Sequence, residues 1–157
     1  MKHIILVLVL LSATSILSAQ SNDDLFFRNV QELFKHAKGQ TFRKGMGYPS
    51  EVLKDQKFSY DLVSIEKTPA GDNTTSVYEY TGINWNKLKK YWAAPRPVGT
   101  NVGLFILEFD EEFPADCNSK SGDNPEKKYK EKRIELIFLN ADYGKLMALF
   151  NGRYKKQ

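Results

Sequence analysis

Two groups of side chains in this sequence have types and spacings that could do chemistry, and the first group is aromatic. Tyr78 and Tyr80 lie two residues apart in a segment with strand-like alternation, so their rings point to one face. Trp85 and Trp92 flank three lysines in the segment WNKLKKYW. Aromatic rings stack on sugar rings or on nucleic-acid bases, while lysines attract anionic groups. We therefore expect a binding site bordered by Tyr78, Tyr80, Trp85 and Trp92.

The second group is a pair of carboxylates, Glu108 and Asp110. In a strand, residues two apart share a face, with about 7 Å between their Cα atoms. Glycosidases place two carboxyl groups roughly 5 to 10 Å apart on either side of a cleft. The pair therefore allows a small glycan hydrolase as an alternative function. A chain of this length offers little room for a cleft, however, and acidic pairs are common at strand ends.

Other catalytic and metal-binding patterns are missing. The sequence has no Gly-x-Ser-x-Gly and no His-Glu-x-x-His motif. Cys117 is the only cysteine, so no internal disulfide can form, and a catalytic cysteine would need a histidine close by. His36 is the only histidine outside the N-terminal segment, and its place on a helix favours a surface role. We expect no metal and no cofactor, and the sequence favours a binding protein over an enzyme.

The N-terminus has the pattern of a secretory signal peptide. Lys2 supplies a charged start, residues 4–11 are all apolar, and the small residue Ala19 marks a cleavage site. The apolar run is shorter than the ~20 residues that span a bilayer, and no second run follows, so we expect no membrane embedding after cleavage. Residues 1–19 are thus predicted to be a signal peptide and residues 20–157 a single domain, exported to the periplasm or out of the cell. A net charge of +4 is too mild to indicate a nucleic-acid partner.

The rest of the chain predicts the elements that position these side chains. Helical spacing of apolar residues predicts a helix over 23–38 that stops at Gly39, and a second helix that begins near Asn140 and stops at Gly152. Alternating or continuous apolar runs predict four strands, over residues 57–67, 75–83, 103–110 and 133–139. A short helix or turn is expected over 85–92, a loop or short irregular element over 40–56, and a long polar excursion over 111–132.

This order predicts an α+β domain with an N-terminal helix, a four-stranded, mainly antiparallel sheet and a C-terminal helix. The element order resembles that of the cystatin-like and NTF2-like architectures. Segments 103–110 and 133–139 are apolar on both faces, whereas two helices cover only one face of a sheet. An uncovered apolar face on a small domain is typical of a binding surface. The alternative is that residues 91–103 fold over this face as ordinary core.

The sequence therefore predicts a small exported binding protein whose site for a small ligand, a glycan or a protein partner lies on an open sheet face. Two alternatives stay open. The domain could be an inhibitor or immunity-type protein that blocks another protein through one face, or a glycan hydrolase that uses Glu108 and Asp110.

Overall fold

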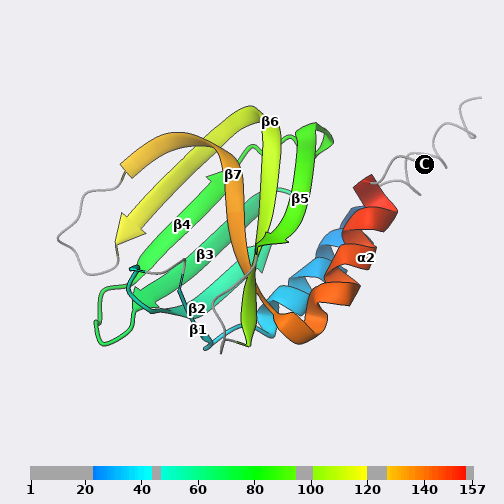
Figure 1. Ribbon diagram of the computed structural model, residues 1–157. Coiled ribbons are helices and arrows are strands. Elements are labelled where there is room, and N and C mark those ends of the chain that lie inside the picture. The colour runs from blue at the N-terminus through cyan, green and yellow to red at the C-terminus, as the bar shows by residue number, and fades with distance from the viewer. Residues whose placement is uncertain (1–22, 44–46, 95–100, 120–126, 155–157) are drawn as a thin grey trace, which may run out of the picture.

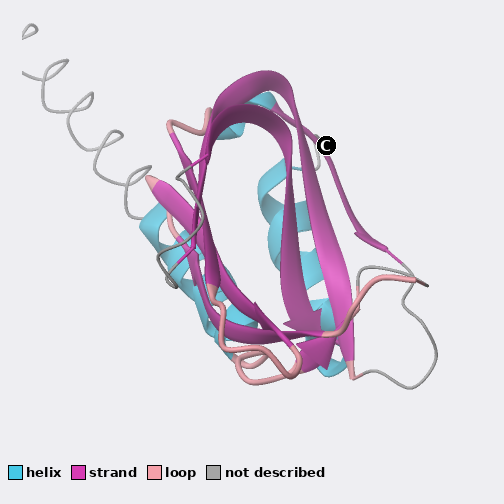
Figure 2. Ribbon diagram, turned by 90° about the vertical axis from the view of Figure 1, so that its left-hand side faces the viewer, coloured by secondary structure: helices cyan, strands magenta, loops and turns pink. Residues whose placement is uncertain are grey.

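The computed structural model describes residues 23–43, 47–94, 101–119 and 127–154, which form an α+β fold (Figure 1). Within these residues, seven antiparallel strands make one sheet that curls round, and two helices pack beside it (Figures 1 and 2). The structure confirms the predicted α+β class, the antiparallel sheet and a helix at each end. The predicted number of four strands is wrong. The predicted signal peptide, residues 1–19, lies outside the described residues.

The first four strands form a meander in which each strand pairs with the next. They are β1 (Thr41–Phe42), β2 (Glu51–Phe58), β3 (Leu62–Pro69) and β4 (Ser76–Thr81). Two expectations for this region are wrong. The loop expected over 40–56 contains β1 and most of β2, and the strand expected over 57–67 spans the end of β2 and the start of β3, because apolar residues continue across the turn between them. That turn is closed by Ser59, whose N–H donates to the carbonyl of Leu62 at 2.9 Å. The predicted strand over 75–83 corresponds to β4.

One long strand joins the meander to the rest of the sheet. Strand β6 (Val102–Ser119) pairs through its first half with β5 (Leu88–Ala94) and through its second half with β4. Strand β7 (Lys127–Leu139) pairs along its other edge. The β6–β7 ladder is irregular between Glu108 and Phe113, where extra β6 residues form a bulge. Bulges bend strands, and here β6 and β7 arch over the meander (Figure 1).

Two further predictions for this region are wrong. Residues 85–92 were expected to be helical, but only η1 (Trp85–Lys87) is, and β5 follows directly. Backbone pairing with β6 overrides the weak helical pattern of that segment. Most of the polar stretch 111–132 belongs to the arms of the β6–β7 hairpin, and residues 120–126 lie outside the described residues. Charged residues suit these arms because one face of an antiparallel sheet can meet water.

The two helices lie side by side next to the sheet (Figure 1). The described part of the N-terminal helix covers residues 23–35, and a turn then leads to Gly39, whose φ of 81° is the left-handed conformation common after helices. Near the C-terminus, η2 (Asn140–Asp142) leads into α2 (Tyr143–Tyr154), which continues past the predicted stop at Gly152. An ion pair between Asp23 and Arg153 joins the helices, and His36 Nδ1 lies 2.8 Å from Asp142 Oδ2.

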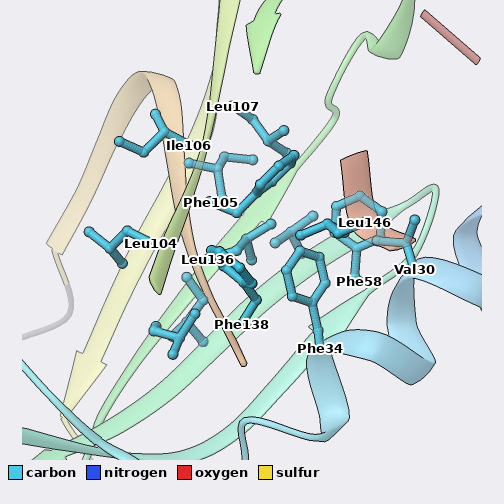
Figure 3. Close-up of a cluster of buried hydrophobic side chains, with 14 of the residues drawn as sticks. Val30, Phe34, Phe58, Leu104, Phe105, Ile106, Leu107, Leu136, Phe138 and Leu146 are labelled. Carbon is cyan, nitrogen blue, oxygen red and sulfur yellow. The ribbon is translucent and has the colours of Figure 1, made fainter. Parts of the chain in front are cut away.

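Phenylalanine dominates the core between the helices and the sheet. The rings of Phe34, Phe58, Phe105 and Phe150 are all buried, and their centroids lie 4.8 to 6.4 Å apart in the four pairs that touch. Phe34, Phe58 and Phe105 are labelled in Figure 3. On the two segments whose both faces are apolar, 103–110 and 133–139, the side chains of Phe105, Leu107, Leu136 and Phe138 are all buried. In the part of the chain that the structure describes, no helix is long and apolar enough to cross a bilayer.

Candidate functional site

On the edge of β7 that faces away from β6, a side chain from β2 satisfies backbone hydrogen-bonding groups. Gln56, which is almost fully buried, donates from Nε2 to the carbonyl of Ile137 and accepts from the N–H of Ile137, both at 3.0 Å. The Gln56 amide thus imitates the backbone of a neighbouring strand. Because Gln56 projects from the concave face of the meander, β7 must stand over that face with its edge toward β2. This position divides the space inside the curled sheet into two sides.

One side is the packed core and the other is a cavity. Ile134, Leu136 and Phe138 of β7 pack toward the helices. Alternate residues of β7 point the opposite way, as successive strand residues must. The same alternation holds on β6, where Leu104 and Ile106 point away from the side occupied by Phe105 and Leu107 (Figure 3).

The cavity has a volume of about 250 Å³ and lies between β3 and β4 on one side and β6 and β7 on the other. We call it the tyrosine cavity. Its lining combines apolar, phenolic and charged side chains: Phe42, Ile65, Leu104, Ile137, Tyr78, Tyr80, Tyr129, Lys67, Glu131, Arg133 and Glu135. Five of these residues come from β7 at every second position, 129 to 137, because the pleat sends alternate side chains to one face.

The three tyrosines are placed by strand pairing. Tyr78 on β4 is the register partner of Cys117 on β6, and Tyr80 is the partner of Ala115, which is also the partner of Tyr129 on β7. Burial, and after it the neighbouring Cys117 thiol, raise the pKa of Tyr78 to about 12. Burial is also the main reason why the pKa values of Tyr80 and Tyr129 are raised, and the carboxylate of Glu131 adds to both shifts. All three phenols are therefore neutral at ordinary pH and can both donate and accept hydrogen bonds.

Most of the charged groups that line the cavity are already paired. Lys67 Nζ lies 2.8 Å from Glu51 Oε1 and 4.8 Å from the centroid of the Tyr78 ring, and only 8% of its side chain is exposed. Arg133 lies 2.9 Å from Glu135, and its side chain is 47% exposed, so this part of the wall meets solvent. Glu131 differs from the others because it makes no hydrogen bond or ion pair with any residue that the structure describes.

The structure brings some of the four predicted site residues together and separates the others. Tyr78 and Tyr80 line the tyrosine cavity. Trp92 lies on β5 outside the lining, although the guanidinium of Arg133 sits over its ring at 5.6 Å. Trp85 belongs to the helix-facing core: it is 2% exposed, and its Nε1 donates to the carbonyl of Tyr60 at 2.7 Å. The predicted aromatic cluster is thus spread over both sides of the sheet.

The carboxylate pair lies away from the cavity. Glu108 and Asp110 occupy the irregular part of β6, and Asp110 Oδ1 lies 3.4 Å from Lys89 Nζ at an exposed position. Ser64 and Lys67 have the Ser-x-x-Lys spacing of some acyl-transfer enzymes. Their odd separation on β3 sends them to opposite faces, so they cannot act as a pair. The described residues hold no group of three His, Cys, Asp or Glu side chains that could bind a metal.

The sequence reasoning missed the contribution of β7 to the cavity. Tyr129, Glu131, Arg133 and Glu135 fall in the stretch that was read as a polar excursion and the start of a strand. Their period of two was the available signal, because Lys128, Lys130 and Lys132 occupy the alternate positions. Lys67 and Phe42 carried no local sign of a site.

No protein-family model, no curated protein and no solved structure matches this chain. The fold and the cavity therefore define it as an α+β domain with a curled antiparallel sheet, and its function has to be argued from the site.

Proposed function

We propose that this chain is a binding protein that holds a small ligand in the tyrosine cavity. The proposal moves the expected site from an open sheet face to the inside of the curl, and keeps Tyr78 and Tyr80 as ligand contacts. The expectation of export still rests on residues 1–19, so the ligand would be met outside the cytoplasm.

The observation that carries the proposal is the contrast between the two sides of β7. The helix-facing side is filled by phenylalanine and leucine side chains, as protein interiors usually are. The other side keeps about 250 Å³ free, with an apolar floor and polar groups around it. Ligand sites combine apolar contact surface with placed polar groups, and this cavity offers both, with more polar and charged side chains than apolar ones. At about 30 Å³ per water molecule, the space corresponds to roughly eight waters, which suits a small organic molecule.

The two alternative functions have weaker support. A glycan hydrolase would need Glu108 and Asp110 to face each other across a cleft, whereas they lie outside the cavity and Asp110 faces Lys89. An inhibitor or immunity-type protein would use an exposed surface, and the exposed large apolar side chains among the described residues, Leu25, Tyr48, Tyr60 and Tyr143, are spread along the chain.

The test is to fill the cavity without touching the core. Leu104→Phe adds volume on the cavity side of β6, and Leu107→Phe adds the same volume on the packed side of the same strand. Leu104→Phe should leave the free energy of unfolding within about 1 kcal/mol of the parent, whereas overpacking at Leu107 should cost about 1 to 3 kcal/mol. Urea unfolding measures both values.

A fragment library is then screened by thermal shift against the parent, Leu104→Phe and the outer-face control Val77→Phe. Fragments that stabilise the parent and the Val77 variant but not the Leu104 variant support the proposal. The proposal fails if Leu104→Phe destabilises the domain as strongly as Leu107→Phe, because the space would then be closed in solution. It also fails if every fragment that stabilises the parent stabilises the Leu104→Phe variant equally.

A further inference from the structure

The charges around the tyrosine cavity do not cancel. Lys67 and Arg133 contribute two positive groups, while Glu131, Glu135 and the Lys67 partner Glu51 contribute three negative groups. Both positive groups lie next to carboxylates, at 2.8 and 2.9 Å, which offset their charge toward a ligand. The group without an ion pair among the described residues is Glu131.

The surroundings of Glu131 favour a positive partner. The neutral phenols of Tyr80 and Tyr129 lie close enough to feel its charge, and a phenol oxygen can accept hydrogen bonds from an ammonium group. Aromatic faces attract cations, and Lys67 already shows this in the cavity, where its ammonium lies 4.8 Å from the centroid of the Tyr78 ring. A carboxylate ligand would instead meet the negative charge of Glu131 with no free cation to offset it.

We infer that the tyrosine cavity selects a small organic cation, such as a primary amine with an apolar body, whose charged group pairs with Glu131. The apolar body lies on Ile65, Leu104 and Ile137, and the ammonium group reaches Glu131 between Tyr80 and Tyr129. This inference rests on the proposed function, because it names the class of ligand for the same cavity.

Three probes of similar size and shape test the charge preference: 2-phenylethylamine, 2-phenylethanol and 3-phenylpropanoate, which are positive, neutral and negative at pH 7. Each is titrated into the full chain by calorimetry, with thermal shift as a second readout. The amine should bind about tenfold more tightly than the alcohol, because its ammonium group adds a full positive charge beside the Glu131 carboxylate, which a hydroxyl does not. The carboxylate should bind most weakly.

The variant Glu131→Gln should remove that advantage and bring amine binding down to the level of the alcohol, while alcohol binding stays unchanged. Its matched control is Glu79→Gln, which makes the same charge change on the outer face of β4, next to Tyr78 and Tyr80 in sequence. The control should keep the full preference for the amine. Unfolding curves of both variants confirm that each is folded at the titration temperature.

The outcomes separate this inference from the proposed function. If the alcohol or the carboxylate binds as well as the amine, and its binding is lost in Leu104→Phe, then the cavity is a site but its charge selection is overturned. An equal loss in Glu131→Gln and Glu79→Gln would show a long-range charge effect and would overturn the role of Glu131. If none of the three probes binds, the inference is overturned, and the proposed function is decided by the cavity-filling variants and the fragment screen.

Discussion

Replacing Gln56 by leucine should show how much the curled sheet depends on one side-chain amide. The substitution puts an apolar, slightly shorter side chain in place of the amide at a position that is 3% exposed. It removes the side-chain amide that pairs with both the N–H and the carbonyl of Ile137. These two backbone groups would then be buried without hydrogen bonds. Each unsatisfied buried group costs about 1 to 3 kcal/mol, and leucine offsets part of this because no amide has to be desolvated. The expected loss in the free energy of unfolding is therefore roughly 2 to 5 kcal/mol.

Such a loss would be large, because a whole domain is usually stable by only about 5 to 15 kcal/mol. The assay is urea unfolding followed by tryptophan fluorescence, since Trp85 is buried in the core. Hydrogen exchange of the Ile137 amide is measured alongside it, because this amide should lose its protection in the variant while those paired with β6 keep theirs. The control is Gln40→Leu, whose side-chain amide makes no hydrogen bond with a described residue.

A second variant at the same site adds a dependence on pH. In Gln56→Glu, the protonated carboxyl can still donate to the Ile137 carbonyl, whereas the carboxylate faces that carbonyl and repels it. The folded state would hold its proton more tightly than the unfolded state does, so stability should rise as the pH falls toward 4. The reasoning about Gln56 is refuted if the leucine variant loses less than about 0.5 kcal/mol and the Ile137 amide stays protected.

Two further predictions concern the packed side of the sheet. A Cβ atom at Gly103 would lie 2.6 Å from the Phe138 ring, so Gly103→Ala should lower the free energy of unfolding by about 1 to 3 kcal/mol. In a Phe138→Leu background this loss should be smaller. Equal losses in the two backgrounds, measured by a double-mutant cycle, would contradict the clash. Trp85→Ala should lower the free energy of unfolding by roughly 3 to 5 kcal/mol, because Phe27, Phe58 and Phe109 surround the Trp85 ring. Trp92→Ala on β5 should lower it much less. Similar melting temperatures for the two variants would contradict this difference.

The local pattern of apolar residues was enough to predict the elements that bury one face or both faces. The helices at both ends were predictable because apolar residues recur at helical spacing, and Phe138 was predictable as core because its strand is apolar throughout. The turn at Ser59 was missed because the residues on either side, Phe58 and Leu62, are both apolar and continue the pattern. The strand character of residues 111–119 and 127–132 was missed because charged side chains there meet water on one face and line a cavity on the other.

The site could be predicted only in part, because its residues come from strands that lie far apart in the sequence. Tyr78 and Tyr80 lie on one strand, so their shared face follows from the pleat alone. Their neighbours Tyr129 and Glu131 come from a strand about fifty positions later, and the register that brings them together depends on the bulge in β6. The position of β7 depends on Gln56, which is 81 positions from Ile137 in the sequence and carries no local signal of its role.

The pairing of the two helices has a consequence for how the chain folds. Asp23 and Arg153 are separated by 130 positions, and His36 and Asp142 by 106. Closing such long loops is entropically unfavourable, so these contacts form after local ones such as the β2–β3 and β6–β7 hairpins. Until α2 exists, Phe58 and Phe105 have no Phe150 to cover them. The core between the N-terminal helix and the sheet therefore cannot be completed until α2 has been synthesised.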